Sequence, residues 1–182
     1  MRVIAGELKG RRLKAPGWDG LRPTSDKLRE TLFNILAPRV PGARVLDAYA
    51  GTGAIGIEAL SRGAAHVTFV DRDPRALALI GENLRLCGVS DRYVIIRGRF
   101  SGVSVSFAPD AVDLAVLDPP YDDPGLEEAV MATEPFLAPG GLVVLEHARR
   151  CAVPAAVGGL ARVRDVTSGD SALAFYARSV RC

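Results

Sequence analysis

Residues 45–60, VLDAYAGTGAIGIEAL, decide the fold of this chain. An apolar run leads into an acidic residue and closely spaced glycines, and a second apolar run follows, which predicts a strand, a tight turn and a helix. Gly51, Gly53 and Gly56 have the G-x-G-x-x-G spacing. In that pattern glycines permit unusual backbone angles, let the backbone approach a ligand and allow close packing of helix on strand. A nucleotide-like ligand is expected over this turn, unless the glycines are incidental to an ordinary strand-to-helix turn.

Two acidic residues narrow the choice of ligand. Asp71 lies twenty residues after Gly51, where such folds place a carboxylate that accepts hydrogen bonds from ribose hydroxyls. Asp47 precedes the glycines, where it would repel the pyrophosphate of a dinucleotide held at the helix N-terminus. A carboxylate there suits the ammonium and sulfonium of S-adenosylmethionine (SAM). We therefore expect SAM rather than NAD, with candidate contacts Asp47, Gly51, Thr52, Gly53, Asp71 and Arg72.

A second stretch concerns the chemistry. Residues 112–117 are apolar apart from Asp113, which is typical of a strand buried on both faces of a parallel sheet. The run ends in Asp118-Pro119-Pro120-Tyr121. Open α/β sheets bind ligands at the carboxyl ends of their strands, so these four residues are expected in the same crevice as the glycine turn. The alternative is a proline-terminated strand followed by an ordinary acidic loop.

Asp118-Pro119-Pro120-Tyr121 resembles the (Asp/Asn/Ser)-Pro-Pro-(Tyr/Phe/Trp) motif of SAM-dependent methyltransferases that modify exocyclic amino groups of bases. Such an amine is a poor nucleophile because its lone pair is delocalised into the ring, until acceptors hold its N–H groups. The Asp118 carboxylate and the Pro119 carbonyl can be those acceptors, and Tyr121 would stack on the extruded base. Methyl transfer is then an in-line displacement that depends on positioning and electrostatics.

The amino-terminal residues carry an excess of positive charge. The whole chain has a net charge of +2, but residues 1–44 hold ten Lys and Arg against four Asp and Glu, a net of +6. Residues 1–14, with glycines in the turn region, predict a β-hairpin whose strands are short and too basic to form a core. A basic segment on a near-neutral domain suggests a nucleic-acid partner held through its phosphates, whereas the alternative is a solvated edge hairpin. The candidate RNA contacts are Arg2, Lys9, Arg11, Arg12 and Lys14.

The opening "RVIAG…KGRRLKAP…LRPTSDKLRETLFNIL" resembles the amino terminus of the bacterial RsmD-type enzymes, which methylate the exocyclic N2 of a guanine in 16S ribosomal RNA. The resemblance covers nearly the whole chain. It implies that Arg22 and Thr24 border the SAM pocket, although both also suit an Arg-Pro turn and a cap for the helix expected over 27–36. It also implies ribosomal RNA or an assembling small ribosomal subunit as partner.

Other functions share parts of this pattern. The Asp-Pro-Pro-Tyr motif also occurs in DNA adenine-N6 and cytosine-N4 methyltransferases, but those usually add a target-recognition domain, for which this chain has no room. An NAD(P) oxidoreductase would account for the glycines and Asp71 and leave Asp47 and Asp118 without a role. A non-catalytic RNA-binding assembly factor that has kept the fold is a further alternative.

The remaining pattern alternates strands and helices. Helices are expected over 54–62, 74–87 and 125–137, and strands over 67–70, 93–97, 142–146, 161–166 and 172–176. The expected fold is α/β, a doubly wound, mostly parallel seven-stranded sheet of the Rossmann-like SAM methyltransferase type. We expect a basic β-hairpin arm over 1–20 and a methyltransferase domain over 21–182. No acidic residue follows the third strand to hold adenine, so Arg99 and Phe100 are candidates there, with Phe100 either covering the ring or packing in the core.

The 182 residues are 48% hydrophobic and 24% charged, an ordinary globular composition for one domain. No apolar run reaches the ~20 residues of a membrane span, and no signal peptide is evident. We expect a cytoplasmic monomer without an obligate protein partner. Cys87, Cys151 and Cys182 are expected to be free thiols and no metal site is expected. The two histidines have no nucleophile motif beside them.

Overall fold

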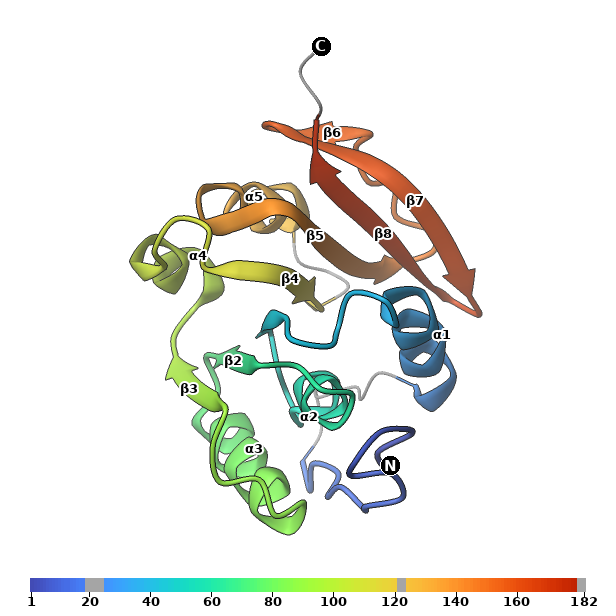
Figure 1. The fold of residues 1–182 in the computed structure, drawn as a ribbon. Helices are drawn as coiled ribbons and strands as arrows, with labels where there is room; N and C mark the ends of the chain where they lie inside the picture. The colour runs from blue at the N-terminus through green and yellow to red at the C-terminus, as the bar shows by residue number, and fades with distance from the viewer. Residues whose placement is uncertain (19–24, 121–123, 180–182) are drawn as a thin grey trace.

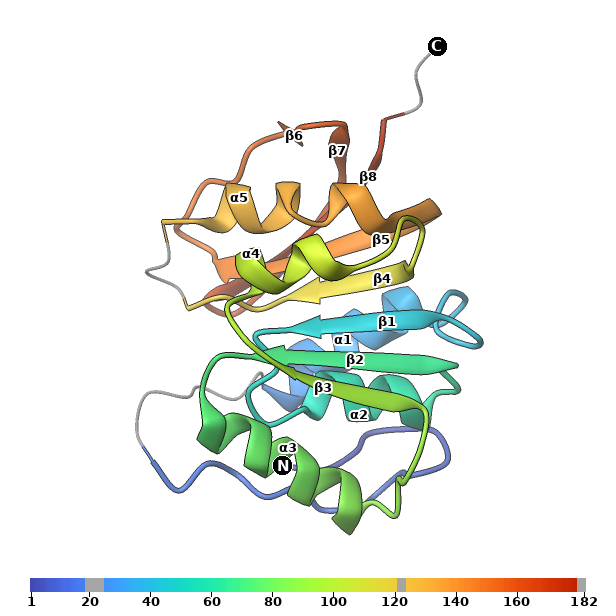
Figure 2. The same cartoon turned by 90° about the vertical axis from the view of Figure 1, so that its left-hand side faces the viewer.

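The computed structural model describes residues 1–18, 25–120 and 124–179. Within them, one sheet has the strand order β3-β2-β1-β4-β5-β8-β7-β6 (Figures 1 and 2). Five strands are parallel: β1 (Arg44–Ala48), β2 (His66–Asp71), β3 (Tyr93–Arg97), β4 (Val112–Leu117) and β5 (Leu137–Ala148). The others pair antiparallel: β8 (Ser171–Arg178) with β5, β7 (Leu160–Ser168) with β8, and β6 (Ala156–Val157) with β7. The mostly parallel α/β sheet is confirmed.

The sheet has eight strands where seven were expected. The additional strand is β6, two residues long, which pairs with the start of β7 across Gly158 and Gly159. Gly158 has φ +56°, a left-handed conformation that glycine adopts readily and that two-residue hairpin turns need. The glycines that break the strand pattern in the sequence therefore form a hairpin turn.

Helices cover both faces of the sheet (Figure 2). α1 (Asp26–Leu36), α2 (Ala54–Ser61) and α3 (Pro74–Leu86) pack with one cluster of buried residues, and α4 (Phe100–Val103) and α5 (Leu126–Met131) pack with the other. Alternate residues of a strand serve the two clusters, because successive side chains point to opposite faces. In β1, Val45 belongs to the first cluster and Leu46 to the second.

Local sequence signals explain most helix ends. The Ser25 hydroxyl caps α1 by accepting a hydrogen bond from the Leu28 N–H (3.1 Å), and Asp73 caps α3 with Pro74 in its first turn. Both are preferred N-terminal arrangements. The helix expected over 125–137 is shorter. It ends at Met131 and a 3-10 turn follows, because Pro135 donates no hydrogen bond and disfavours helical geometry in the preceding residue.

Two further differences concern strand β5 and helix α4. β5 begins at Leu137 and not at 142, with an irregularity that moves the register from Val112↔Leu137 to Leu114↔Leu142. Residues 139–141 thus form a bulge within the strand. Helix α4, one turn long, was not expected, because it is too short to show a helical period.

The amino-terminal segment, which we define as residues 1–14, reverses direction as predicted but forms no strands. One antiparallel bridge joins Arg2 and Arg12. The expectation that it contributes nothing to the core was wrong. Val3 and Leu13 are buried, 1% and 6% exposed, in the cluster that contains α1 and α2. The segment places Val3 and Leu13 inward while its Arg and Lys side chains stay exposed.

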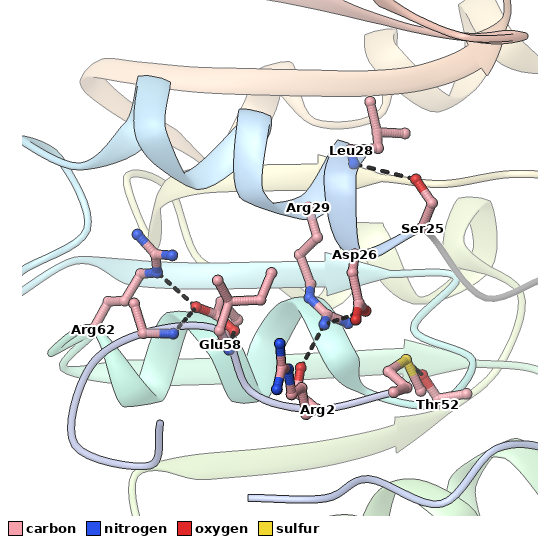
Figure 3. Close-up of polar contacts among 11 residues, drawn as sticks. Arg2, Ser25, Asp26, Leu28, Arg29, Thr52, Glu58 and Arg62 are labelled. Atoms are coloured by element: carbon pink, nitrogen blue, oxygen red, sulfur yellow. Dashed lines mark hydrogen bonds and ion pairs between the residues drawn. The ribbon is translucent and has the colours of Figure 1, made fainter. Parts of the chain in front are cut away.

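Polar groups of α2 hold this segment against the domain. The carboxylate of Glu58, which is fully buried, accepts hydrogen bonds from the backbone N–H groups of Ile4 (2.7 Å) and Ala5 (3.0 Å). It also accepts one from Arg62 Nε (2.8 Å), which balances its charge (Figure 3). At Gly6 a Cβ atom would lie 1.8 Å from the Ser61 carbonyl oxygen. The approach is therefore possible only for glycine, and the segment packs directly against α2.

A buried arginine lies beside the same contact (Figure 3). Arg29 of α1 donates through Nη2 to the Arg2 carbonyl (2.6 Å) and to the Asp26 carboxylate (2.8 Å). Burial lowers the pKa of the Arg29 guanidinium, while the carboxylates of Asp26 and Glu58 oppose that shift. Within the described residues its Nε and Nη1 have no hydrogen-bond partner. The amino-terminal segment therefore meets α1 and α2 in a packed interface that contains charged groups.

We expect Gly56→Ala to destabilise the protein by about 1–3 kcal/mol, the usual cost of overpacking a core. A Cβ at Gly56 would meet the Phe69 ring at 2.2 Å and Val67 Cγ1 at 2.8 Å. The measurement is urea unfolding followed by circular dichroism. Gly81→Ala is the control, because a Cβ in that helix meets nothing within 4 Å and alanine favours the helix. Equal stability of wild type and Gly56→Ala would contradict the close approach of α2.

Candidate active site

A cavity of about 980 Å³ lies at the carboxyl ends of the parallel strands. The order β2-β1-β4-β5 reverses direction between β1 and β4, and open α/β sheets bind ligands at that position. The cavity collects residues from distant parts of the chain. It is lined among others by Asp47, Tyr49, Gly51, Thr52, Asp71, Arg72, Arg99, Phe100, Asp118, Pro119, Pro120 and Glu146. Every described candidate for catalysis or cofactor binding except Gly53 is in this lining.

The glycine turn has the geometry that its spacing predicts. Gly51 and Gly53 have φ +54° and +75°, values that L side chains rarely adopt. Gly53 directly precedes α2 and is not part of the cavity wall, whereas Gly51 and Thr52 are. Tyr49, just before the turn, also has a positive φ of +61°, which is uncommon for a residue with a bulky side chain and is concentrated at functional sites.

Asp71 joins the second strand to the glycine turn. One carboxylate oxygen accepts the Gly51 N–H (2.9 Å) and the other accepts the Asp73 N–H (2.8 Å). An ionised carboxylate has about four acceptor positions, so Asp71 can still accept hydrogen bonds from a ligand. Its contact with ribose hydroxyls stays a prediction.

Asp47 is a buried carboxylate in the cavity wall. It is 1% exposed, and one oxygen accepts the Gly56 N–H at 2.8 Å. Burial raises the pKa of Asp47 well above its usual value, the Gly56 N–H opposes the shift, and the negative charges of Asp118 and Asp71 add to it. A positive group in the cavity would relieve this unfavourable environment for a carboxylate.

The end of the third strand supplies Arg99 and Phe100. Arg99 is exposed and precedes α4. Phe100 is buried, with ring centroids 6.1 Å from Tyr49 and 6.4 Å from Phe136, and it lines the cavity as well. Phe100 therefore packs in the core, and covering an adenine ring from that position stays a prediction.

Asp118, Pro119 and Pro120 leave the sheet at the carboxyl end of β4. The Asp118 N–H donates to the Ala48 carbonyl (3.4 Å), which extends the β1–β4 pairing by one residue. Pro119 is buried and Pro120 is exposed. The side chains of Tyr121, Arg22 and Thr24 lie outside the described residues. The prediction that the motif shares a crevice with the glycine turn is confirmed for its first three residues.

The sequence reasoning missed several cavity residues. Glu146 could have been found, because it is near the carboxyl end of the strand beside β4, where ligands bind. Ser25 and Lys27 enter from α1, and residues 168–171 enter from the β7–β8 turn. The sequence of that turn carries no local signal of function. It reaches the cavity only because β7 and β8, far along the chain, pair as an antiparallel hairpin.

The five basic candidates for RNA contact are all exposed: Arg2, Lys9, Arg11, Arg12 and Lys14. Lys14 forms an ion pair with Glu82. Arg2 and Lys9 line a second cavity of about 350 Å³, and Lys27 lines both cavities. Exposed basic side chains therefore line both cavities, together with Asp26 and Glu30 in the second one.

One buried side chain joins the amino-terminal segment to the glycine turn. Asn83 of α3 accepts the Lys14 N–H (2.8 Å) and donates to the Lys14 carbonyl (3.2 Å) and the Thr52 carbonyl (2.9 Å). The Thr52 hydroxyl also donates to the Met1 sulfur (4.0 Å). The basic segment and the cavity wall therefore share one hydrogen-bonded support.

Metal ligands, thiols and membrane spans can be judged for residues 1–18, 25–120 and 124–179. No three or more His, Cys, Asp or Glu side chains gather there as a metal site. Cys87 and Cys151 are free thiols, and Cys182 lies outside the described residues. In the same ranges, the helices are all too short or too polar to cross a membrane.

The fold and this cavity define a Rossmann-like α/β protein with a ligand-sized cavity at the carboxyl ends of its parallel strands. The structure is similar to that of the yhhF protein of Escherichia coli, with TM-score 0.86 and 33% identity over 100% of this chain and 99% of that one. It is also similar to the protein TTHA0928 of Thermus thermophilus, with TM-score 0.79 and 29% identity over 96% and 98%.

Residues 1–177 match the family "Conserved hypothetical protein 95", and the chain belongs to this family. Among curated relatives, it is 33% identical over 183 residues to "Ribosomal RNA small subunit methyltransferase D" of Escherichia coli (strain K12), covering 100% of this chain and 91% of the relative. It is 37% identical over 180 residues to the YlbH protein of Bacillus subtilis (strain 168), covering 97% and 98%. The protein is a methyltransferase of the RsmD family.

We expect Asp47→Asn to raise the free energy of unfolding at neutral pH. The pKa of Asp47 is higher in the folded state than its unfolded value of about 3.9. Such a group stabilises the fold fully only below the unfolded pKa, and this contribution is lost as pH rises through the folded pKa. Asparagine does not titrate and can still accept the Gly56 N–H. The gain should therefore shrink toward zero at about pH 4, as measured by urea unfolding at both pH values.

Asp113→Asn is the control of opposite sign. The Arg44 guanidinium lowers the pKa of Asp113, so its contribution is present at neutral pH and is lost as pH falls. This variant should be less stable than wild type at neutral pH. A loss of stability in Asp47→Asn at neutral pH would contradict the unfavourable burial of the Asp47 carboxylate.

Proposed function

We propose that this protein transfers a methyl group from SAM to the exocyclic N2 amine of a guanine in small-subunit ribosomal RNA. The observation that carries the proposal is that Asp118, Pro119 and the glycine turn line one cavity. The Escherichia coli relative named ribosomal RNA small subunit methyltransferase D, which matches over the whole chain, supports the RNA substrate. An rRNA substrate would place the enzyme in the cytoplasm.

The residues of the cavity fit SAM. The buried Asp47 carboxylate favours a cationic ligand, Gly51 lets the backbone approach it, and Asp71 has acceptor positions left for ribose hydroxyls. A volume of about 980 Å³ is within the range of cofactor pockets. When bound, SAM would supply a methyl carbon for attack by the amine nitrogen; an N–C bond would form, the C–S bond would break so that the neutral thioether leaves, and the nitrogen would lose a proton.

In this proposal, Asp118 holds the target amine. Its carboxylate accepts one N–H of the amine, and the Pro119 carbonyl accepts the other. These bonds favour a pyramidal nitrogen whose lone pair points away from the ring. Acceptors that are fixed in advance act most strongly on the transition state, because they need no reorganisation during the reaction. We expect Tyr121 to stack on the extruded base.

The exposed basic residues would hold the RNA backbone. Lys27 lines both cavities, so phosphates bound at the amino-terminal segment would lead toward the larger one. A segment this small can contact few bases and so recognises little of the RNA sequence. The shape of a structured RNA would supply much of the recognition.

The proposal is tested by incubating the protein with labelled SAM and naked small-subunit rRNA, assembling subunit particles or DNA. We expect N2-methylguanosine in one of the two RNA substrates. N6-methyladenine or N4-methylcytosine in DNA would support a DNA enzyme instead. No incorporation, together with calorimetry that detects NAD and not SAM, would reject the methyltransfer proposal.

We expect Asp118→Ala to lower the single-turnover rate by a factor on the order of 10² to 10³, the range seen when one transition-state hydrogen-bond partner is removed. Rapid-quench measurement with saturating SAM and RNA gives this rate. Asp113→Ala is the control, since Asp113 is on the same strand but pairs with Arg44 and is absent from the cavity wall. A near wild-type rate for Asp118→Ala, with both substrates bound, would reject the amine-holding role.

Arg11→Ala with Arg12→Ala should weaken RNA binding and leave SAM affinity unchanged. Each lost phosphate contact should reduce the slope of log K against log salt by about 1. The control removes the same charge outside the amino-terminal segment, by Arg39→Ala with Arg44→Ala; Arg39 is bonded to Gly140 and Arg44 to Asp113. Equal salt slopes for the two double variants would remove the amino-terminal segment from the RNA surface.

A further inference from the structure

Glu146 is a cavity residue that the proposed chemistry leaves without a role. It is on β5, is 5% exposed and lines the larger cavity. Among the acidic side chains of the described cavity wall, Asp47 and Glu146 are the two that are buried. Removing a carboxylate from water is costly unless it makes specific interactions. Its backbone is fixed by pairing with Leu173 of β8, so the carboxylate is held on a rigid strand.

The sheet places Glu146 beside Asp118, on the side away from the glycine turn. Leu117 of β4 is in register with Leu145 of β5, so Asp118 and Glu146 are the next residues on neighbouring parallel strands, which lie about 5 Å apart. On the other side, β1 pairs with β4 and leads into the glycine turn. Asp118 therefore lies between the turn over which the cofactor is proposed to bind and Glu146.

This order determines which part of a substrate meets Glu146. An amine held at Asp118 faces the methyl donor on the β1 side, so the ring that carries the amine extends toward β5. Enzymes that extrude a base read its Watson–Crick edge with hydrogen bonds. On that edge guanine places the N1–H donor directly beside the 2-amino donor, whereas adenine and 2-aminopurine place a bare N1 acceptor beside their amines.

We infer that Glu146 is the residue that selects guanine, by accepting a hydrogen bond from guanine N1–H while Asp118 holds the neighbouring N2 amine. This inference rests on the proposed function. Two adjacent carboxylates accept from two adjacent donors, since an ionised carboxylate can only accept. A base with a bare N1 would place its lone pair against the acceptor oxygens of the Glu146 carboxylate, an unfavourable contact between two acceptors.

The test compares kcat/KM for guanosine and for 2-aminopurine at the target position, in whichever rRNA form the wild type methylates. 2-Aminopurine keeps the 2-amino group and lacks N1–H. We expect the wild type to prefer guanosine roughly 10²-fold, the upper range for one well-placed pair of base contacts. Glu146→Gln should reduce the preference to about tenfold or less, because a glutamine amide can donate to a bare N1 or accept from N1–H.

Glu128→Gln is the matched control, because Glu128 also lines the cavity but is exposed on α5. It removes the same charge and should keep the wild-type preference. Calorimetry with SAM and a thermal melt check that Glu146→Gln is folded and binds the cofactor. If it does not fold, Glu146→Asp, which keeps the carboxylate, should keep the preference for guanosine.

Two results would overturn the inference: a wild type that methylates both bases equally, or a Glu146→Gln enzyme with an unchanged guanosine preference. Parallel loss of preference in Glu128→Gln would assign the effect to the charge of the cavity and would also reject it. A wild type that methylates no guanosine at all would reject the proposed function itself, so the two failures are distinguishable.

Discussion

The contact between Gly56 and the Phe69 ring sets how closely α2 approaches the sheet. A Cβ atom at Gly56 would lie 2.2 Å from that ring, so any larger residue would push the helix outward. At this distance Asp47 of β1 reaches the Gly56 N–H, and the preceding turn lies over the carboxyl ends of β1 and β2. The cavity therefore depends on the absence of a side chain at Gly56. Its position between β1 and β4, where the strand order reverses direction, follows from the topology of the sheet.

α2 also carries the polar groups that hold the amino-terminal segment. The side chains of Glu58 and Ser61 accept hydrogen bonds from the backbone N–H groups of residues 4, 5 and 8, and Arg62 compensates the Glu58 charge. An unpaired carboxylate in this place would be costly, so the buried pair makes the position of the segment specific. Through Asn83, the same segment supports the glycine turn. The surface proposed to bind RNA therefore rests on the same residues that support the glycine turn.

Two carboxylates in the cavity wall are buried, which lowers the stability of the fold unless they are compensated. The buried Asp47 carboxylate is disfavoured by desolvation and by the negative charges of Asp118 and Asp71, and Glu146 is also buried in the same wall. Functional sites often keep such groups, because a charge that is poorly solvated before binding interacts strongly with a ligand of opposite sign. A cationic donor and an amine with N–H groups are complementary to this wall.

The sequence by itself determined the local elements and the candidates at strand ends. Strands β3 and β4 have the predicted bounds, and Asp47, Asp71 and Asp118 meet in one cavity, because periodicity, caps and the carboxyl-end rule are short-range signals. Tertiary structure alone decided the burial of Val3 and Leu13 and the entry of residues 168–171 into the cavity. It also decided the contacts of Glu58 with Ile4 and Ala5, which are 54 and 53 residues away in the sequence. Hydrogen bonds and packing between such distant residues leave no local pattern, since each partner is unremarkable until the chain brings the two together.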